Sequence, residues 1–313
     1  MQASGSDGYT TRAEAAYPAF PLRLKLLRWV GRQTWLPKGQ DWILRKIWHP
    51  ETGQAFPFVA DFFGMRYPGD IARTIDWNVW AYGSYAYSEL TLLNDLSSWL
   101  HKKRDTVTFF DAGANVGHHT LYMAGRADKV IAFEPFAVVR ELIQQKLELN
   151  RLSCVTVLPV ALGEKDETLR YYPGGKGNSG AGTFLPEEIG TYEEPVEIRV
   201  CNGDRLFAEL ALPRMDILKM DVEGFEPLVL RGLSSRMHQD RPMVLMELNA
   251  RSRSGFGSEA GFRSAFWDGA LFAEVRGRRG CPFKLKPLHY ETADEVLILP
   301  PEAAEFMQGK LTA

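Results

Sequence analysis

The sequence has few of the features that mark secreted, membrane-spanning or nucleic-acid-binding proteins. Its 313 residues include only three cysteines, and these match neither a metal-ligand spacing nor an even set of disulfides. The net charge of -2 gives no electrostatic footprint for nucleic acid or an anionic membrane. No run approaches the ~20 apolar residues that a membrane span requires. We therefore expect a cytoplasmic protein with a small-molecule partner, no nucleic acid and no membrane span; its oligomeric state cannot be read from the sequence.

The composition changes along the chain and suggests three segments. Residues 1–16 are small and polar without apolar periodicity, which predicts a disordered tail. Residues 17–104 hold seven of the eight tryptophans, so we expect an N-terminal helical and aromatic cap laid over the main domain. Within it, three basic residues interrupt the apolar stretch 22–30, which predicts an amphipathic helix rather than a signal peptide.

Residues 105–313 show a different pattern, in which short apolar runs alternate with amphipathic segments of helical length. This alternation is typical of parallel βαβ units in an α/β fold with helices on both faces of the sheet. The expected strands are 107–111, 129–134, 155–161, 215–221, 243–248, 271–276 and 295–299.

The first strand of this region runs into a helix through a turn with the pattern Asp-x-Gly-x-Asn-x-Gly. Asp111, Gly113, Asn115 and Gly117 occupy the four fixed positions. Glycines there permit a tight turn and a close backbone approach, while the following helix presents free N–H groups to a polar ligand. The spacing differs from the dinucleotide fingerprint Gly-x-Gly-x-x-Gly.

The second strand ends in an acidic residue, Glu134, followed by Pro135. A carboxylate at that position can accept hydrogen bonds from both ribose hydroxyls of an adenosine, and Pro135 would place an apolar surface beside the adenine. The alternative is a solvated acid at a strand end. Because Glu134 follows the glycine turn of the first strand, we favour the adenosine site.

The fourth strand carries charges where a central strand should be apolar. Lys219 and Asp221 share one face by their period of two, and Glu223 continues the pattern at the carboxyl edge, where open parallel sheets bind ligands. A structural ion pair between Lys219 and Asp221, with Glu223 and Glu226 as first-turn helix acids, is the alternative. Glu247 is a further acid at the end of an apolar strand.

These motifs, in this order, resemble the FkbM family of S-adenosylmethionine-dependent methyltransferases. The resemblance covers residues 105–250, with a weaker echo at 77–89 that includes Glu89. It rests on the segments 111–117, 133–135, 149–152, 161–162 and 219–226, and on Glu247.

The resemblance implies a class I methyltransferase (Rossmann-like) fold with a seven-stranded, mostly parallel sheet whose last two strands form an antiparallel hairpin. It also implies S-adenosyl-L-methionine as cofactor, with Ala161 among the cofactor-binding residues, and O-methylation of a small metabolite or a sugar acceptor. One departure is His118-His119, which stand where the family more often has aromatic residues.

Methyl transfer to a hydroxyl requires a base near the methyl group. Asp221, Glu223 and His119 are the candidates, Asp221 by position and His119 because imidazole titrates near neutrality. Asp221, Glu223 and Glu247 could also hold a divalent metal, a question the sequence leaves open. The rival functions are an NAD-type dehydrogenase on a similar scaffold and a non-catalytic adenosine-binding module.

Overall fold

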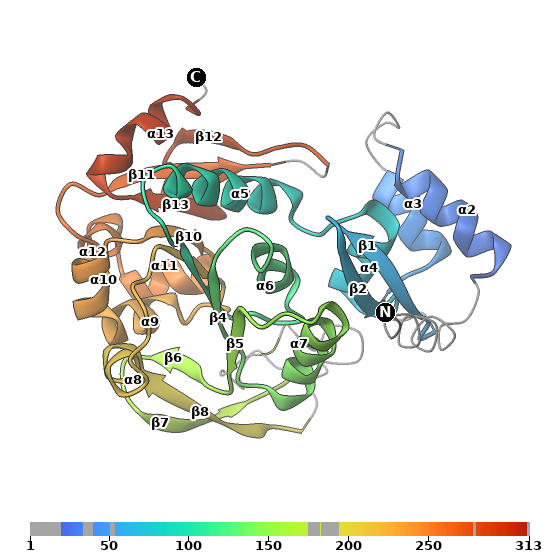
Figure 1. The fold of residues 1–313 in the computed structure, drawn as a ribbon, viewed down its shortest axis with the longest axis horizontal. Helices are drawn as coiled ribbons and strands as arrows, with labels where there is room; N and C mark the ends of the chain where they lie inside the picture. The colour runs from blue at the N-terminus through green and yellow to red at the C-terminus, as the bar shows by residue number, and fades with distance from the viewer. Residues whose placement is uncertain are drawn as a thin grey trace, which may run out of the picture. The chain divides into compact units, whose positions relative to one another are not determined.

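The computed structural model describes residues 20–33, 40–50, 54–174, 182, 194–277 and 280–311. They fall into two units that divide between Tyr85 and Ala86 (Figure 1). The predicted tail at 1–16 lies outside the described residues. Of the helices in the described ranges, none combines the length and apolarity needed to cross a lipid bilayer.

The first unit is a hairpin packed with helices. Its elements are α2 (Leu22–Gly31), α3 (Gln40–Ile47), β1 (Pro57–Phe62), β2 (Met65–Asp70) and α4 (Thr74–Tyr82). The hairpin turns at Phe63-Gly64, where both residues have positive φ. The predicted amphipathic helix is confirmed as α2.

Aromatic side chains and one buried carboxylate hold this unit together. Trp77 and Trp80 of α4 are fully buried and their rings lie 5.3 Å apart. Asp76, which directly precedes Trp77, accepts hydrogen bonds from the Tyr67 hydroxyl at 2.8 Å and the Asp70 amide at 3.0 Å. A carboxylate with these donors tolerates burial, and it ties α4 to β2.

The second unit contains an eight-stranded mixed sheet in the order β12-β11-β13-β10-β9-β3-β4-β5. The parallel strands are β3 (Thr108–Ala112), β4 (Lys129–Phe133), β5 (Val155–Leu158), β9 (Ile217–Met220) and β10 (Met243–Glu247). The antiparallel strands are β11 (Leu271–Arg276), β12 (Lys284–Pro287) and β13 (Glu295–Leu299). The predicted fold class is confirmed, but the sheet has eight strands rather than seven, because β12 adds an edge strand that the sequence did not reveal.

A smaller sheet and a set of helices complete this unit. The small sheet has the order β6-β8-β7, with β6 (Ala161–Gly163), β7 (Glu167–Tyr171) and β8 (Val196–Asn202). The helices are α5 (Tyr87–His101), α6 (His118–Met123), α7 (Ala137–Asn150), α8 (Gly203–Glu209), α9 (Glu226–Gly232), α10 (Ser234–Asp240), α11 (Ala250–Phe256), α12 (Glu259–Ser264) and α13 (Ala304–Gln308), with a 3₁₀ turn η2 (Pro301–Ala303).

Helices cover both faces of the large sheet, so most side chains of its central strands are apolar and buried. On one face, Phe110, Leu218 and Val244 pack with side chains of α8, α9, α10 and α12 in a large core cluster. On the other face, Ala132 of β4 packs with α7. Neighbouring residues in a strand point to opposite faces, so Asp111 and Lys219 lie on the face away from the large core cluster. The carboxyl ends of β3, β4 and β9 meet at one edge, where the chain forms a crevice.

Candidate active site

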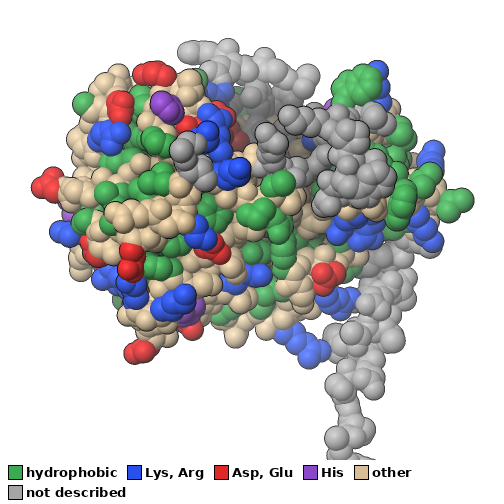
Figure 2. Space-filling model, turned by 90° about the horizontal axis from the view of Figure 1, so that it is seen from above, with side chains coloured by type: hydrophobic (Ala, Val, Ile, Leu, Met, Phe, Trp, Pro, Cys, Tyr) green, Lys and Arg blue, Asp and Glu red, His purple; other side chains and the backbone are tan. Residues whose placement is uncertain are grey.

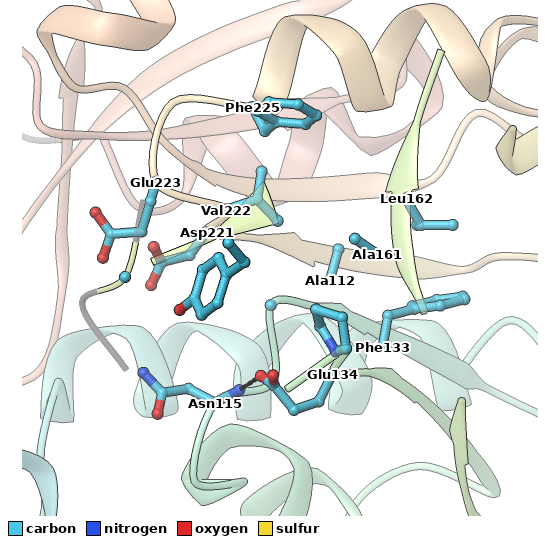
Figure 3. A pocket seen from close by; sticks show the side chains of 14 residues that line it. Ala112, Asn115, Phe133, Glu134, Ala161, Leu162, Asp221, Val222, Glu223 and Phe225 are labelled. Carbon is cyan, nitrogen blue, oxygen red and sulfur yellow. Dashed lines mark hydrogen bonds between the residues drawn. The ribbon is translucent and has the colours of Figure 1, made fainter. Parts of the chain in front are cut away.

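A crevice that is open to solvent lies at this edge (Figure 3). Its walls come from the turns after β3, β4 and β9 and from β6 and β7. Seven of the ten expected site residues line it: Gly113, Asn115, Glu134, Pro135, Ala161, Asp221 and Glu223. Apolar side chains, including Phe133, Leu162, Val222 and Phe225, line it as well.

The turn after β3 is tight because two glycines occupy left-handed conformations. Gly113 has a φ of 78°, and a Cβ there would lie 2.0 Å from the carbonyl oxygen of Asp221. Gly117 has a φ of 79° and faces Ile143 of α7, which a Cβ would approach to 3.0 Å. Gly113 thus permits the turns after β3 and β9 to touch, whereas Gly117 serves helix packing outside the crevice.

Glu134 is buried beside this turn and is bound by the backbone on both sides. Its Oε2 accepts the N–H of Asn115 at 2.9 Å, and its Oε1 accepts the N–H of Phe136 at 2.9 Å (Figure 3). Burial raises the pKa of Glu134 to about 7, although both backbone hydrogen bonds oppose the shift. Each carboxylate oxygen has two lone pairs, so the carboxylate keeps acceptor capacity for a ligand in the crevice.

The charges of the fourth strand form an ion cluster that is only partly open to the crevice. The ammonium of Lys219 is buried, 3.3 Å from Asp221 Oδ2 and from the carbonyl of Gly113, and 3.8 Å from Asp111 Oδ1. Burial alone would lower the pKa of Lys219, but Asp221, Asp111 and Glu89 outweigh it and raise the pKa above its ordinary value. Asp221 remains 44% exposed and reaches the crevice.

Asp111 and His119 lie behind the crevice wall. Asp111 is fully buried and accepts the hydroxyl of Thr120 at 2.6 Å. His119 is also buried, with Nε2 3.1 Å from Glu89 Oε2 but outside hydrogen-bonding geometry. Burial and the nearby Lys219 charge lower the pKa of His119 to about 3, so its imidazole is a weak proton acceptor near neutrality.

Three acids of adjacent strands form a row at the carboxyl edge. Glu247 pairs directly with Glu295 of β13, and Asp221 follows β9 at the level of Glu247. Burial, followed by the charges of Asp221 and Glu223, raises the pKa of Glu247 to about 8. Burial also raises the pKa of Glu295, and the adjacent Glu89 adds to it. Facing carboxyl groups in such a row share protons, since like charges directly opposite are unfavourable.

The turn after β9 is held in place by a chain of hydrogen bonds. Glu226 is fully buried and accepts the N–H of Val222 at 3.0 Å and the hydroxyl of Ser252 at 2.6 Å. Asn249 accepts the N–H of Ser252 at 2.9 Å and donates to Glu247 at 2.9 Å. The chain therefore links the acid row to the crevice turn. The buried carboxylate of Glu226 acts as a brace.

Metal binding was left open by the sequence. Within the described ranges, no three His, Cys, Asp or Glu side chains converge in a way that could hold a metal ion. Figure 3 shows the carboxyl groups of Asp221 and Glu223 on the same side of the crevice.

Sequence reasoning missed three members of the site. Glu295 lies on an antiparallel strand far along the chain, and its place in the acid row depends on strand register. Tyr171 and Phe225 supply ring walls to the crevice. Only Phe225 had a signal, as part of the segment 219–226.

The model of the family described as Methyltransferase FkbM domain matches residues 111–277, more than half of the chain. Methyltransferase sdnD of Sordaria araneosa is 35% identical over 155 residues, which cover 39% of this chain and 59% of that protein. Hexuronic acid methyltransferase AglP of Haloferax volcanii is 29% identical over 158 residues, which cover 48% of this chain and 59% of that protein. The chain thus spans less than two thirds of the length of these curated relatives. A crystal structure of a methyltransferase FkbM from Methylobacillus flagellatus is 18% identical with a TM-score of 0.42, over 63% of this chain and 44% of that one.

Proposed function

The chain belongs to the FkbM methyltransferase domain family, and from this premise we propose that it transfers the methyl group of S-adenosylmethionine to a hydroxyl of a small metabolite or sugar. The observation that carries the proposal is Glu134 beside the Gly113 turn in one crevice. A buried carboxylate with unused acceptor capacity suits the two hydroxyls of a ribose. A lone solvated acid at a strand end would have neither burial nor backbone donors.

The polarity of the crevice residues suits the cofactor. Glu134 would accept the ribose hydroxyls, and Pro135 and Leu162 would contact the adenine ring. Gly113 keeps the backbone close to the ligand, since any side chain there would meet Asp221. The bound cofactor supplies an activated methyl group on a sulfonium. The protein's task is then to align the acceptor and to remove its proton.

Asp221 is our candidate for the general base. It reaches the crevice, and Lys219 holds one of its oxygens at 3.3 Å, which fixes the orientation of the carboxylate. Glu223 is the second candidate. This residue is exposed, but partial desolvation of its carboxyl group, followed by the charges of Asp221 and Glu226, raises its pKa to about 7. A base with that pKa matches proton transfer near neutrality.

Calorimetry with candidate cofactors, followed by a turnover assay, tests the proposed methyl transfer. We expect S-adenosylhomocysteine to bind and NAD not to bind; tight NAD binding without a response to S-adenosylhomocysteine would refute the proposal. Turnover is measured as S-adenosylhomocysteine release with a panel of sugars. Hexuronic acids enter this panel because AglP, a hexuronic acid methyltransferase, is similar to this chain.

The base is tested by Asp221→Asn, with Glu223→Gln as its matched control on the same turn. Loss of a general base lowers turnover by about 10²- to 10⁴-fold. S-adenosylhomocysteine affinity should stay within about threefold, because the base acts on the acceptor rather than the cofactor. Full turnover in Asp221→Asn would exclude Asp221 as the base, and selective loss in Glu223→Gln would transfer the role to Glu223. Binding without turnover on any acceptor would favour the adenosine-binding module.

A further inference from the structure

Helix α2 of the first unit has two apolar faces, of which one is buried. Leu24, Leu27 and Gly31 recur at helical spacing and face the interior. A Cβ at Gly31 would lie 2.5 Å from the carbonyl oxygen of Ala81, so α2 sits directly against α4. This close approach fixes the rotation of α2 about its own axis, and with it the direction of the second face.

The second face is exposed although it is equally apolar. Leu22, Leu26 and Trp29 follow one another at spacings of four and three, and they are 82%, 60% and 59% exposed. The neighbouring helix α3 exposes Trp42 and Ile47. Scattered apolar residues are ordinary on a protein surface, but a stripe along one helix marks a binding face.

Basic side chains border this stripe. Arg23 and Lys25 lie on either side of it by helical position, and Lys46 lies 3.8 Å over the ring of Trp42. Residues 20–50 contain seven Lys or Arg and one Asp, against a net charge of -2 for the whole chain. No acidic side chain of the described residues forms an ion pair with Arg23 or Lys25. The segment 20–50 is therefore basic, although the whole chain has a small negative net charge.

We propose that the exposed face of α2, together with α3, is a docking surface for an anionic lipid membrane. Helices that lie in the interface place Leu and Trp among the acyl chains and Lys or Arg at the headgroups. The right-hand end of Figure 2, where Figure 1 draws α2, shows hydrophobic side chains exposed beside Lys and Arg side chains. The helix lies on the membrane and does not cross it, in keeping with its ten residues.

The charge and the stripe together favour lipid over the other possible occupants. A nucleic acid would use the basic side chains but would leave exposed Leu22 and Leu26 without partners. A second copy of the chain would bring an equally basic surface against this one, which is electrostatically unfavourable. An anionic bilayer matches both properties at once. The proposal is independent of the methyl-transfer reaction.

Flotation of the full chain with vesicles tests the proposal. We expect binding to vesicles of phosphatidylcholine with phosphatidylglycerol to be about tenfold tighter than to phosphatidylcholine alone, since each basic residue near an anionic surface adds to the affinity. Leu26→Glu with Trp29→Glu should lower the affinity for anionic vesicles by about tenfold or more, because it puts charge into the apolar stripe. Arg23→Gln with Lys25→Gln should remove most of the preference for anionic lipid.

The matched control is Leu210→Glu, which changes an exposed leucine of the second unit and should leave binding unchanged. Circular dichroism and Tm establish that each variant is folded, as expected for exposed positions. Absence of vesicle binding by the unmodified chain overturns the proposal, and so does equal binding by the Leu26→Glu, Trp29→Glu variant. Dimerisation in light scattering that this variant abolishes, without vesicle binding, assigns the face to a second copy instead.

Discussion

The protonation of Glu134 should control cofactor affinity near neutral pH. Burial raises its pKa from 4.5 to about 7, which corresponds to about 3 kcal/mol of unfavourable ionisation in the empty crevice. Ribose hydroxyls donate to the ionised carboxylate, so a bound adenosine favours the deprotonated form. The protonated form, dominant below pH 7, has lost an acceptor. Affinity should therefore rise with pH across this window.

The magnitude follows from the fraction of Glu134 that is ionised. With a pKa of about 7, that fraction rises about tenfold between pH 6 and pH 8, which is about 1.4 kcal/mol of binding free energy. Isothermal titration calorimetry with S-adenosylhomocysteine at both pH values measures it directly. The thioether ligand avoids turnover, and its carboxyl group titrates well below this window.

The variant Glu134→Gln tests whether the pH dependence of affinity comes from Glu134 or from the other acids whose pKa is raised. Its amide has one acceptor oxygen for the two backbone donors at 115 and 136, so we expect weaker binding and a loss of about 1–3 kcal/mol in the free energy of unfolding. The affinity that remains should not change between pH 6 and pH 8. Equal affinity at both pH values in the unmodified chain would refute the reasoning, as would an unchanged pH dependence in Glu134→Gln.

Two further predictions concern the turns that enclose the crevice. Gly113→Ala should abolish S-adenosylhomocysteine binding and lower the Tm, because its Cβ would meet the carbonyl of Asp221. Gly257 also has a positive φ but lies in open space, so Gly257→Ala should lower the free energy of unfolding by only about 1 kcal/mol. Similar effects of the two substitutions would contradict the clash. Glu226→Ala should release the Val222 N–H and reduce turnover more than cofactor affinity, measured as kcat against the calorimetric Kd, whereas Glu226→Gln keeps an acceptor and should restore most activity. Equal turnover in the unmodified chain and Glu226→Ala would show that the brace does not position the site.

The apolar strands of the large sheet could be predicted from the sequence, whereas its edge strand β12, which has little apolar surface, could not. The strands 271–276 and 295–299 coincide with β11 and β13 because each carries several apolar residues in a row. β12 reads Lys-Leu-Lys-Pro, and only Leu285 of its four residues is buried. An edge strand needs one partner and little apolar surface, so its pattern carries almost no signal.

The motifs predicted which residues belong to the site, but not which of them line the crevice and which are buried behind it. Glu134 and Asp221 follow strands of the same parallel sheet, so their meeting at one edge required only chain order. Asp111 stands equally close to a strand end, yet strand register places it opposite Lys219, and the two meet inside the protein. Lys219 therefore forms a structural ion pair, as the alternative interpretation of the fourth strand predicted. The same cluster reaches the crevice through Asp221.

The facing carboxyl groups of Glu247 and Glu295 give the site its own proton buffer. Transfer of a methyl group from a sulfonium to a hydroxyl leaves a neutral thioether and one free proton. A carboxyl group with a raised pKa, such as Glu247 with a pKa of about 8, ionises more readily while a cation is close and binds a proton again once that positive charge is gone. In the proposed reaction, these two carboxyl groups gain proton affinity at the step that liberates a proton. The carboxyl groups would then bind the proton that the acceptor releases. The proton would not accumulate beside the methylated product, where it could reverse the transfer, and no exchange with bulk water would be needed.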